Sequence, residues 1–344
     1  MSSFHSILSS FDYPLPPELI AKEPASPRDS ARLLICNRKN QAVTFDRFSN
    51  IIEYLPENAV LVFNRTKVIP AKMTLRKITG GAVSALLLSV QPETITVLAS
   101  GTLKPGDKLI WQGGHSLTVI NRNNQEALLK PSFPITELRD LLDQFGETPL
   151  PPYLKDSPLP EDRRRSEYQT VFATENGSVA APTAGLHFTE SLINNIEQSG
   201  RGVAYVTLHV HLGTFAPLTE EQWIQKKLHT EHYSIDEQTA SMLNRAKADG
   251  RPIIAVGTTT VRTLESASNA STLVRLNGST GLFLTEESSL HFVDHLITNF
   301  HVPKSSLLML VSAFTGREKL FELYDRAIKE RMRFFSFGDG MMVI

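Results

Sequence analysis

The sequence has a single cysteine, Cys36, and no long hydrophobic run. One cysteine cannot form an internal disulfide, which excludes a disulfide-stabilised secreted scaffold and suits a reducing cytoplasm. Residues 1–20 lack the basic stretch followed by an apolar run that marks a signal peptide. The longest apolar segment, around 307–314, is far shorter than the roughly 20 residues of a membrane-spanning helix. These absences predict a soluble, cytoplasmic protein.

An excess of charge of one sign is also missing. The chain has 35 Lys and Arg against 36 Asp and Glu, a net charge of −1. This balance excludes a globally basic nucleic-acid binder but leaves room for a local basic patch. A hydrophobic content of 41% excludes wholesale disorder, and 344 residues suit two domains.

Short β-rich runs dominate the segment from position 59 to about 130. Gly, Pro or Asn separates many of them, and they leave no room for crossover helices, so they indicate a small antiparallel barrel or sandwich. The expected strands are Val60–Phe63, Val83–Leu88, Thr94–Leu98, Lys108–Trp111, Leu117–Ile120 and Ala127–Leu129. A proline-dense stretch at 149–160 then marks a domain boundary, since proline resists both helices and central strands.

From about position 168 onward, strands and helices alternate. Apolar runs at 203–210 and 253–256 predict strands, and apolar spacing predicts helices over 236–249, 303–316 and 317–332. We therefore expect a mixed α/β fold, in which a larger α/β domain (1–58 and 150–344) carries an inserted small antiparallel β-barrel domain (59–149).

Three junctions carry the polar groups of greatest interest. They read Ala-Pro-Thr-Ala-Gly-Leu-His-Phe at 181–188, Val-Gly-Thr-Thr-Thr-Val-Arg at 256–262 and Thr-Asn-Phe-His at 298–301. In the first, Thr189 can cap the following helix. Each junction can present free N–H groups and hydroxyls to a ligand, because ligand sites collect at strand ends in α/β folds. The first could equally be a well-made loop-to-helix junction with a structurally bonded histidine, and the second a threonine-rich helix cap.

Histidines raise the alternative of a metal site. Thr207, His209 and His211 would share one face of a strand, and His229 and His232 follow about twenty residues later. These four histidines could form a zinc site, which would make the protein a metal-dependent hydrolase. The sequence has neither an HExxH motif nor paired cysteines that would support a metal site. Histidines that are hydrogen-bonded within the fold or exposed at the surface would give the same spacing.

Two basic segments could contact phosphates. One runs through Asn-Arg-Thr-Lys at 64–67 to Lys72, Arg76 and Lys77, and the other is Arg-Arg-Arg at 163–165. Arginine can form paired hydrogen bonds with phosphate, although a solvated surface would produce the same charges. Dinucleotide and nucleoside-triphosphate fingerprints and a nucleophile-elbow motif are all missing.

Taken together, these segments resemble the S-adenosylmethionine:tRNA ribosyltransferase-isomerase family of the queuosine pathway, almost end to end. The junctions at 179–189, 256–259 and 298–301 carry much of the resemblance. The other matching segments lie at 12–16, 61–64, 68–71, 168–171, 206–210, 212–215, 262–265, 293–294, 307–314, 333–336 and 338–339.

The resemblance implies a transferase that uses S-adenosylmethionine as ribosyl donor. It implies transfer to 7-aminomethyl-7-deazaguanine at the tRNA wobble position, rearrangement to epoxyqueuosine, and release of adenine and methionine. Such chemistry needs a base beside the sulfonium and an acid at adenine, and it needs no metal. The implied partner is the tRNA anticodon loop, with S-adenosylmethionine on the larger domain and tRNA contacts on the barrel.

Site residues follow from the resemblance and the residue chemistry. The expected catalytic residues are His187 and His209 first, with His301, Glu231 and His229 behind them. The expected S-adenosylmethionine contacts are Pro182, Thr183, Gly185, Thr214, Phe215, Thr258, Thr259, Arg262, Asn299 and Asp339. The expected tRNA contacts are Arg65, Lys67, Lys72, Arg163, Arg164, Arg165, Tyr168 and Gln169.

Some positions depart from the family pattern. Asn-Arg-Thr-Lys at 64–67 replaces Asn-Asp-Thr-Arg, so an essential acid at position 65 is not expected. His211 stands where the family has glycine, His232 where it often has an aromatic residue, Gly340 where it has alanine and Ser84 where acidic residues are common. A non-catalytic RNA-binding module is the third interpretation of the chain.

Overall fold

The computed structural model describes residues 4–210 and 217–344 of the chain. It divides into two compact units, each described by itself below. The first comprises Met1–Lys67, Pro152–Leu159 and Glu167–Ile344, and the second comprises Val68–Pro151 and Pro160–Ser166. The first change between units thus falls at position 68, later than the expected 59.

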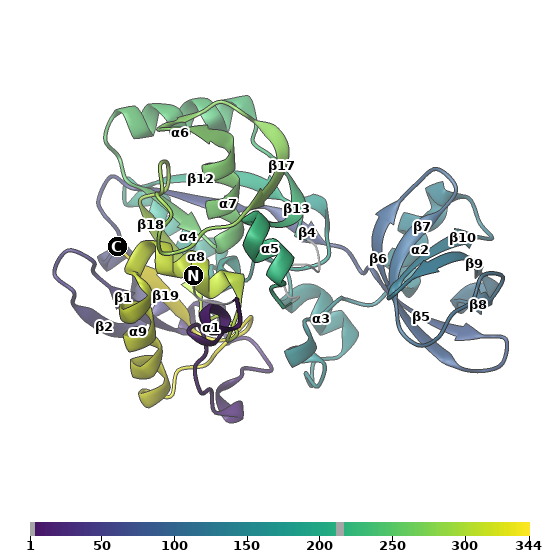
Figure 1. Ribbon diagram of the computed structural model, residues 1–344. Helices are drawn as coiled ribbons and strands as arrows, with labels where there is room; N and C mark the ends of the chain where they lie inside the picture. Colours follow the sequence, from purple (N-terminus) through teal and green to yellow (C-terminus); the bar gives the residue numbers. More distant parts are fainter. Residues whose placement is uncertain (1–3, 211–216) are drawn as a thin grey trace. The chain divides into compact units, whose positions relative to one another are not determined.

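The larger unit is built on a nine-stranded mixed sheet (Figure 1). Four of its strands, β12 (Gly202–Leu208), β3 (Val60–Asn64), β14 (Ile253–Val256) and β18 (His295–Asn299), run parallel to one another, so their carboxyl ends meet at one edge. In spatial order the strands are β17 (Asn277–Leu282), β13 (Lys227–Ser234), β12 (Gly202–Leu208), β3 (Val60–Asn64), β14 (Ile253–Val256), β18 (His295–Asn299), β19 (Gly340–Val343), β1 (Arg32–Cys36) and β2 (Val43–Arg47).

Strand β3 lies at the centre of this sheet, which corrects the prediction that Val60–Phe63 belongs to the barrel. It pairs in parallel with β12 on one side and β14 on the other. Val60 and Val62 pack into the hydrophobic core on one face, while Leu61 and Phe63 pack into the core on the opposite face. A continuous apolar run is typical of a strand that is buried on both faces.

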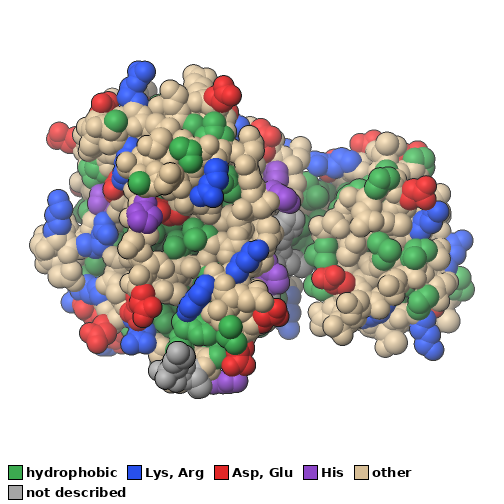
Figure 2. All heavy atoms as spheres, turned by 45° about the horizontal axis from the view of Figure 1, so that its top comes forward, with side chains coloured by type: hydrophobic (Ala, Val, Ile, Leu, Met, Phe, Trp, Pro, Cys, Tyr) green, Lys and Arg blue, Asp and Glu red, His purple; other side chains and the backbone are tan. Residues whose placement is uncertain are grey.

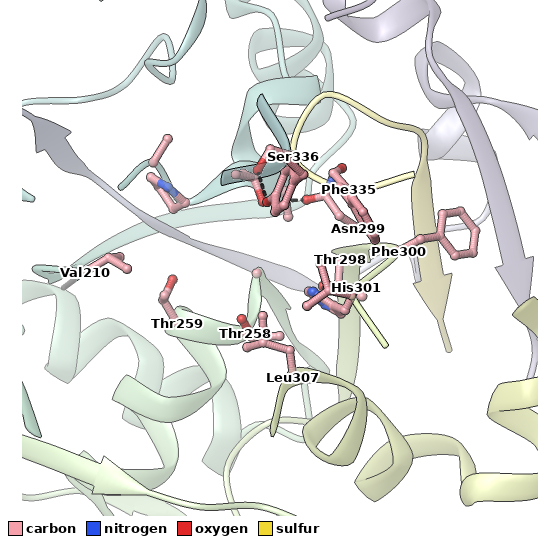
Figure 3. A pocket seen from close by; sticks show the side chains of 17 residues that line it. Val210, Thr258, Thr259, Thr298, Asn299, Phe300, His301, Leu307, Phe335 and Ser336 are labelled. Carbon is pink, nitrogen blue, oxygen red and sulfur yellow. Dashed lines mark hydrogen bonds between the residues drawn. The ribbon is translucent and has the colours of Figure 1, made fainter. Parts of the chain in front are cut away.

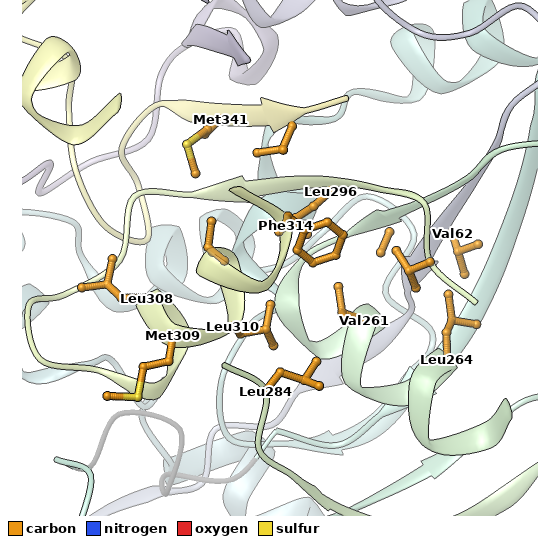
Figure 4. Close-up of a cluster of buried hydrophobic side chains, with 14 of the residues drawn as sticks. Val62, Val261, Leu264, Leu284, Leu296, Leu308, Met309, Leu310, Phe314 and Met341 are labelled. Atoms are coloured by element: carbon orange, nitrogen blue, oxygen red, sulfur yellow. The ribbon is translucent and has the colours of Figure 1, made fainter. Parts of the chain in front are cut away.

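Helices cover both faces of the sheet. Those on one face include α7 (Thr258–Ala267) and α8 (Ser306–Thr315). Their side chains gather in the core shown in Figure 4, among them Val261, Leu264, Leu308 and Leu310. The helices of this unit are α1 (Phe4–Ser9), α4 (Glu190–Gln198), α5 (Glu220–Gln225), α6 (Glu237–Ala248), α7 (Thr258–Ala267), α8 (Ser306–Thr315) and α9 (Arg317–Lys329). Its 3-10 turns are η1 (Pro17–Leu19), η2 (Arg28–Ser30), η3 (Phe48–Glu53), η6 (Pro152–Leu154) and η7 (Thr183–His187).

Local sequence signals place several helix starts. Thr189 caps α4 by accepting a hydrogen bond from the Leu192 amide at 3.1 Å, as predicted. Asp236 caps α6 in the same way. Helix α8 begins at Ser306, later than the Pro303 start that the sequence suggested, because Ser305 provides the cap.

The smaller unit is a closed six-stranded barrel in which every neighbouring pair of strands is antiparallel. This confirms the predicted fold class of an α/β unit with a small antiparallel barrel. In chain order the barrel strands are β5 (Lys72–Lys77), β6 (Ala82–Val90), β7 (Ile95–Ala99), β8 (Lys108–Ile110), β9 (Ser116–Asn123) and β10 (Glu126–Pro131). They are accompanied by η4 (Gln112–Gly114), η5 (Ile135–Glu137), α2 (Leu138–Phe145) and α3 (Glu161–Glu167).

Two small ladders complete the structure: β4 (Thr66–Val68) with β11 (Glu175–Ser178), and β15 (Ser268–Asn269) with β16 (Thr272–Leu273). Within residues 4–210 and 217–344, no helix is both long and apolar enough to cross a membrane. On the face shown in Figure 2, Lys and Arg are interspersed with Asp and Glu rather than gathered in one field.

Candidate active site

A pocket lies at the sheet edge where the parallel strands end (Figure 3). It brings together the three junctions that the sequence singled out, which are far apart along the chain. Its lining consists of residues 181–184, 257–259, 298–302 and 335–336, with Tyr153, Val210 and Leu307. The carboxyl edge of a parallel sheet is where α/β folds generally bind ligands.

One side of the pocket is the start of α7. Gly257 directly follows β14 with a φ of 91°, a backbone geometry that side chains disfavour, and this turn leads into the helix. Among the residues that the structure describes, no side chain caps this helix start. Thr258 and Thr259 are the first two helical residues, and both line the pocket. The first turn of α7 can therefore offer N–H groups and hydroxyls to an anionic or polar group.

Asn299, at the end of β18, links three segments around the pocket. Its Oδ1 accepts a hydrogen bond from the Thr183 hydroxyl at 2.8 Å, and its Nδ2 donates to the Phe335 carbonyl at 3.2 Å. The same Nδ2 lies 3.2 Å from Nε2 of His187. Because the Phe335 carbonyl can only accept, the orientation of the Asn299 amide is fixed.

His187 is consequently a neutral imidazole whose Nε2 accepts from Asn299. Burial, with smaller contributions from the guanidinium groups of Arg333 and Arg28, lowers the pKa of His187 to about 3. Its ring stacks on Phe48 with centroids 4.7 Å apart, and it does not belong to the pocket lining. The geometry makes His187 a support for Asn299.

His301 does line the pocket. Its Nε2 lies 2.8 Å from the Thr298 hydroxyl, while its amide donates to the Tyr324 hydroxyl and its carbonyl accepts from Tyr13. Burial lowers the pKa of His301 to about 4, so its imidazole is neutral at pH 7. Of the expected catalytic histidines in the described chain, His301 is the one in the pocket wall.

His209 follows the end of β12 at Leu208, so it does not share a strand face with Thr207 as expected. Its Nδ1 lies 2.9 Å from the Thr66 hydroxyl, and the ring packs against Gly177. It is half-buried and lies outside the pocket lining.

Glu231 and Arg262 form a buried ion pair with each other, joining β13 to α7. Both side chains are nearly inaccessible, and neither lines the pocket. Arg262 also donates to the Thr280 carbonyl of β17 at 3.4 Å. Their geometry is that of a structural tie between a helix and the sheet.

Asp339 holds the turn before β19. Its carboxylate accepts from the backbone amides of Arg32 at 3.0 Å and Arg333 at 2.7 Å, and it pairs with the Arg333 side chain at 3.4 Å. It is buried and is not among the residues that line the pocket. Gly185 also lies outside that lining, whereas Pro182 is part of it. Thr214 and Phe215 lie outside the described residues.

The expected tRNA contacts are spread over both units. In the larger unit, Arg65 approaches Glu175 and Asp236 at 3.9 and 3.7 Å, whereas Lys67 is exposed. Tyr168 is fully buried, with its ring edge-on to Phe337, and Gln169 accepts from Arg28 through its carbonyl. The burial of Tyr168 leaves its ring no surface for stacking on a base.

The remaining expected tRNA contacts lie in the smaller unit. Lys72 pairs with Glu147 at 2.7 Å. Arg163 is exposed and Arg164 is half-buried, both on α3. Arg165 donates to the carbonyls of Asp143 and Gly146, which ties α3 to the end of α2.

The proposed metal site finds no support in the part of the chain that the structure describes. No group of three or more His, Cys, Asp or Glu there could hold a metal ion. His229 and His232 are exposed, and His232 contacts the Ser279 hydroxyl at 2.8 Å. His211 lies outside the described residues. Nothing observed therefore favours a metal-dependent hydrolase.

Asn64, at the end of β3, also organises this edge of the sheet, although it was not among the predicted site residues. Its amide contacts Leu208, Thr66 and the pocket residue Thr259. A polar side chain directly after an apolar strand was the signal that could have identified it.

Comparisons with known proteins cover nearly the whole chain. The model of a family described as "Queuosine biosynthesis protein" matches residues 8–343. Two proteins named S-adenosylmethionine:tRNA ribosyltransferase-isomerase, from Carboxydothermus hydrogenoformans and Thermosipho melanesiensis, are 43% and 44% identical over 341 residues, 98% of this chain and 99% of theirs. The crystal structure of S-adenosylmethionine tRNA ribosyltransferase from Thermotoga maritima is similar with a TM-score of 0.56 and 34% identity, over 97% of this chain and all of that one.

Proposed function

Because the chain belongs to the queuosine biosynthesis protein family, we propose that it is an S-adenosylmethionine:tRNA ribosyltransferase-isomerase. The observation that carries this proposal is the identity of more than 40% over 98% of the chain to relatives with that name. The pocket adds independent support, since the most specific matching segments come together there.

The proposed reaction moves the five-carbon ribosyl part of S-adenosylmethionine onto an amine of the tRNA. The acceptor is the aminomethyl group of 7-aminomethyl-7-deazaguanine at the wobble position of the anticodon loop. A nitrogen–carbon bond to that amine forms, and the ribosyl part rearranges, with a new carbon–carbon bond that closes its ring, to the epoxycyclopentane of epoxyqueuosine. The bonds to adenine and to the sulfonium sulfur break, the amine and the carbon beside the sulfur each give up a proton, and adenine and methionine leave. An unpaired base in an RNA loop suits such a target, because its edges are accessible to a protein.

We propose that S-adenosylmethionine binds in the pocket of the larger unit. The first turn of α7 offers its N–H groups and the hydroxyls of Thr258 and Thr259 to the carboxylate of the methionine part. Thr183 and Asn299, joined by a hydrogen bond, form another part of the wall. Apolar groups such as Leu307 and Val302 supply surface for the remainder of the donor.

His301 is the proposed base for the proton beside the sulfonium. It lines the pocket, and its neutral imidazole can accept a proton. Asn299 and His187 act together as positioning residues, since Nε2 of His187 is engaged by the Asn299 amide. His209 remains a candidate at the end of β12, and Glu231 is assigned to the ion pair with Arg262.

The remaining assignments are also proposals. Exposed cations, including Lys67 and Arg163, are the proposed phosphate contacts, and the barrel unit is a proposed tRNA-binding part. We propose that the reaction needs no metal, since the sulfonium activates the donor. A buried, unpaired Cys36 and a tRNA substrate agree with a cytoplasmic location.

An adenine-release assay tests the proposed function. Purified protein, S-adenosylmethionine and tRNA carrying the aminomethyl-deazaguanine should yield adenine, and unmodified tRNA should yield none. Solvent deuterium entering the C5′ position of S-adenosylmethionine would report proton removal, and His301→Ala should lower that exchange much more than His229→Ala. Absence of tRNA-dependent adenine release would exclude the function, while full exchange in His301→Ala would exclude only the base.

A further inference from the structure

We infer that Asn64 sets the direction of the Thr259 hydroxyl, so that Thr259 donates a hydrogen bond into the pocket to the carboxylate of S-adenosylmethionine. The identity of this ligand rests on the proposed function. Asn64 is thereby a positioning residue, and Thr259 is the residue that touches the substrate.

The amide of Asn64 is buried and fully used. Its Oδ1 accepts from the backbone amides of Leu208 and Thr66, each at 3.1 Å. Its Nδ2 donates to the Leu208 carbonyl at 3.0 Å and to the Thr259 hydroxyl oxygen at 3.1 Å. Two amide donors on one side and a carbonyl acceptor on the other fix which end of the side chain is nitrogen. Asn64 therefore donates to Thr259 and cannot accept from it.

The proton of the Thr259 hydroxyl must consequently point elsewhere. Its helical neighbours Thr260 and Thr263 donate to the carbonyls of Val256 and Thr259, four residues earlier in each case. Thr259 makes no such bond, and no acceptor for its proton is found within residues 4–210 and 217–344. The residue is 6% exposed and lines the pocket, so it is a buried donor that faces the ligand space.

The position of this donor indicates the chemistry of its acceptor. Thr259 lies in the first turn of α7, whose free N–H groups favour a negative charge. In Figure 3, Thr258 and Thr259 lie along the same side of the pocket as Val210. A hydroxyl donor beside free amide groups suits a carboxylate, because hydrogen bonds to an ionised acceptor are the stronger kind.

Affinity for S-adenosylmethionine tests this inference by equilibrium dialysis with the full-length protein. Thr259→Val should raise Kd at least tenfold, about 1.4 kcal/mol for one hydrogen bond. Thr259→Ser, which keeps the hydroxyl, should stay within threefold of wild type. Thr260→Val is the matched control: it removes a neighbouring buried hydroxyl that bonds the backbone, and Kd should not change.

The role of Asn64 is tested by non-additivity. Asn64→Asp replaces the donor with an acceptor, so Thr259 would turn its proton toward the carboxylate and away from the ligand. Asn64→Asp should weaken binding as much as Thr259→Val, and the double variant should be no weaker than Thr259→Val alone. Effects that simply add would overturn the positioning role. If Asn64→Asp fails to fold, Asn64→Ala replaces it, since it removes the donor without adding an acceptor. In the Asn64→Ala background, Thr259→Val should raise Kd by a smaller factor than it does in the wild type.

Decarboxylated S-adenosylmethionine identifies the acceptor. Thr259→Val should have little effect on the binding of this analogue, since the acceptor is already missing. An equal loss with both ligands would overturn the carboxylate assignment, and unchanged S-adenosylmethionine binding in Thr259→Val would overturn the inference as a whole. Failure of the wild type to bind S-adenosylmethionine would instead count against the proposed function.

Discussion

The side-chain amide of Asn299 lies 3.2 Å from Nε2 of His187 and donates to it, which fixes the protonation of a buried histidine. Since Nε2 accepts, the proton of the neutral ring must be on Nδ1. Nitrogen NMR of histidine-labelled protein should therefore show the Nδ1–H tautomer for His187 at pH 7. His187→Asn assigns the signal, and an Nε2–H tautomer or an imidazolium there would contradict the geometry.

Stability should fall with pH below the ordinary histidine pKa. His187 and His301 have folded-state pKa values of about 3 and about 4 against 6.5 when exposed. Between pH 6.5 and 4 the unfolded chain thus binds protons that the folded protein excludes, so stability is complete above pH 6.5 and is lost as pH falls. Each histidine should contribute up to about 1.4 kcal/mol per pH unit to the unfolding free energy.

Urea unfolding at pH 7.5, 6 and 5 measures this slope. The protein has two tryptophans, Trp111 in the barrel unit and Trp223 in the larger unit. In a Trp111→Phe background, fluorescence reports the larger unit alone. Adding His301→Gln should flatten the slope and His229→Gln should not; an unchanged slope with His301→Gln would refute the prediction.

The Glu231–Arg262 pair should behave as a structural tie. Because both side chains are buried, Glu231→Gln or Arg262→Met leaves a charge without its partner and should cost about 3–5 kcal/mol of unfolding free energy. The double variant should lose clearly less than the sum. Arg326→Ala, which breaks an exposed pair with Glu322 at 3.2 Å, is the control and should cost less than about 1 kcal/mol. Additive losses for the buried pair would show that the two residues do not depend on each other.

The backbone conformation of Gly257 should set the position of the α7 start and thereby the KM for S-adenosylmethionine. Its φ is 91°, and an added Cβ would meet Ala184 and Thr259 only at ordinary contact distances of 3.7 and 3.8 Å. Gly257→Ala should therefore cost about 1–2 kcal/mol of stability from backbone strain and raise KM for S-adenosylmethionine by shifting the start of α7. Gly200→Ala, at a φ of 86° with no atom near its Cβ, should cost similar stability and leave KM unchanged. Equal KM values in the two variants would count against this role of the α7 start.

The sequence predicted elements with strong local signals. Three such predictions agree with the structure: the cap at Thr189, the helix over 236–249 and the strand over 253–256. Each depends on residues that are near one another in the chain. Strand β5 was not predicted, although apolar and polar residues alternate along it from Lys72 to Arg76. The apolar run of β3 was placed in the wrong unit, since such a run does not specify its partner strands.

The site was predictable as a set of junctions but not as a set of contacts. The three junctions do converge, because parallel strands bring their carboxyl ends to one edge. Three charged residues have the types expected of a ligand site but bond to other parts of the protein. Arg262 and Glu231 pair with each other, and Asp339 accepts from the backbone amide of Arg333. Their partners lie on other elements, and only packing determines which charged groups meet there.

The most direct test of the proposed function follows two isotopic labels in S-adenosylmethionine into tRNA. With carbon label in the ribose, label should enter the modified base of tRNA, with adenine and methionine released in equal amounts. With carbon label in the methyl group, all label should leave with methionine. Transfer of the methyl label to tRNA, or no ribose label in tRNA, would contradict ribosyl transfer.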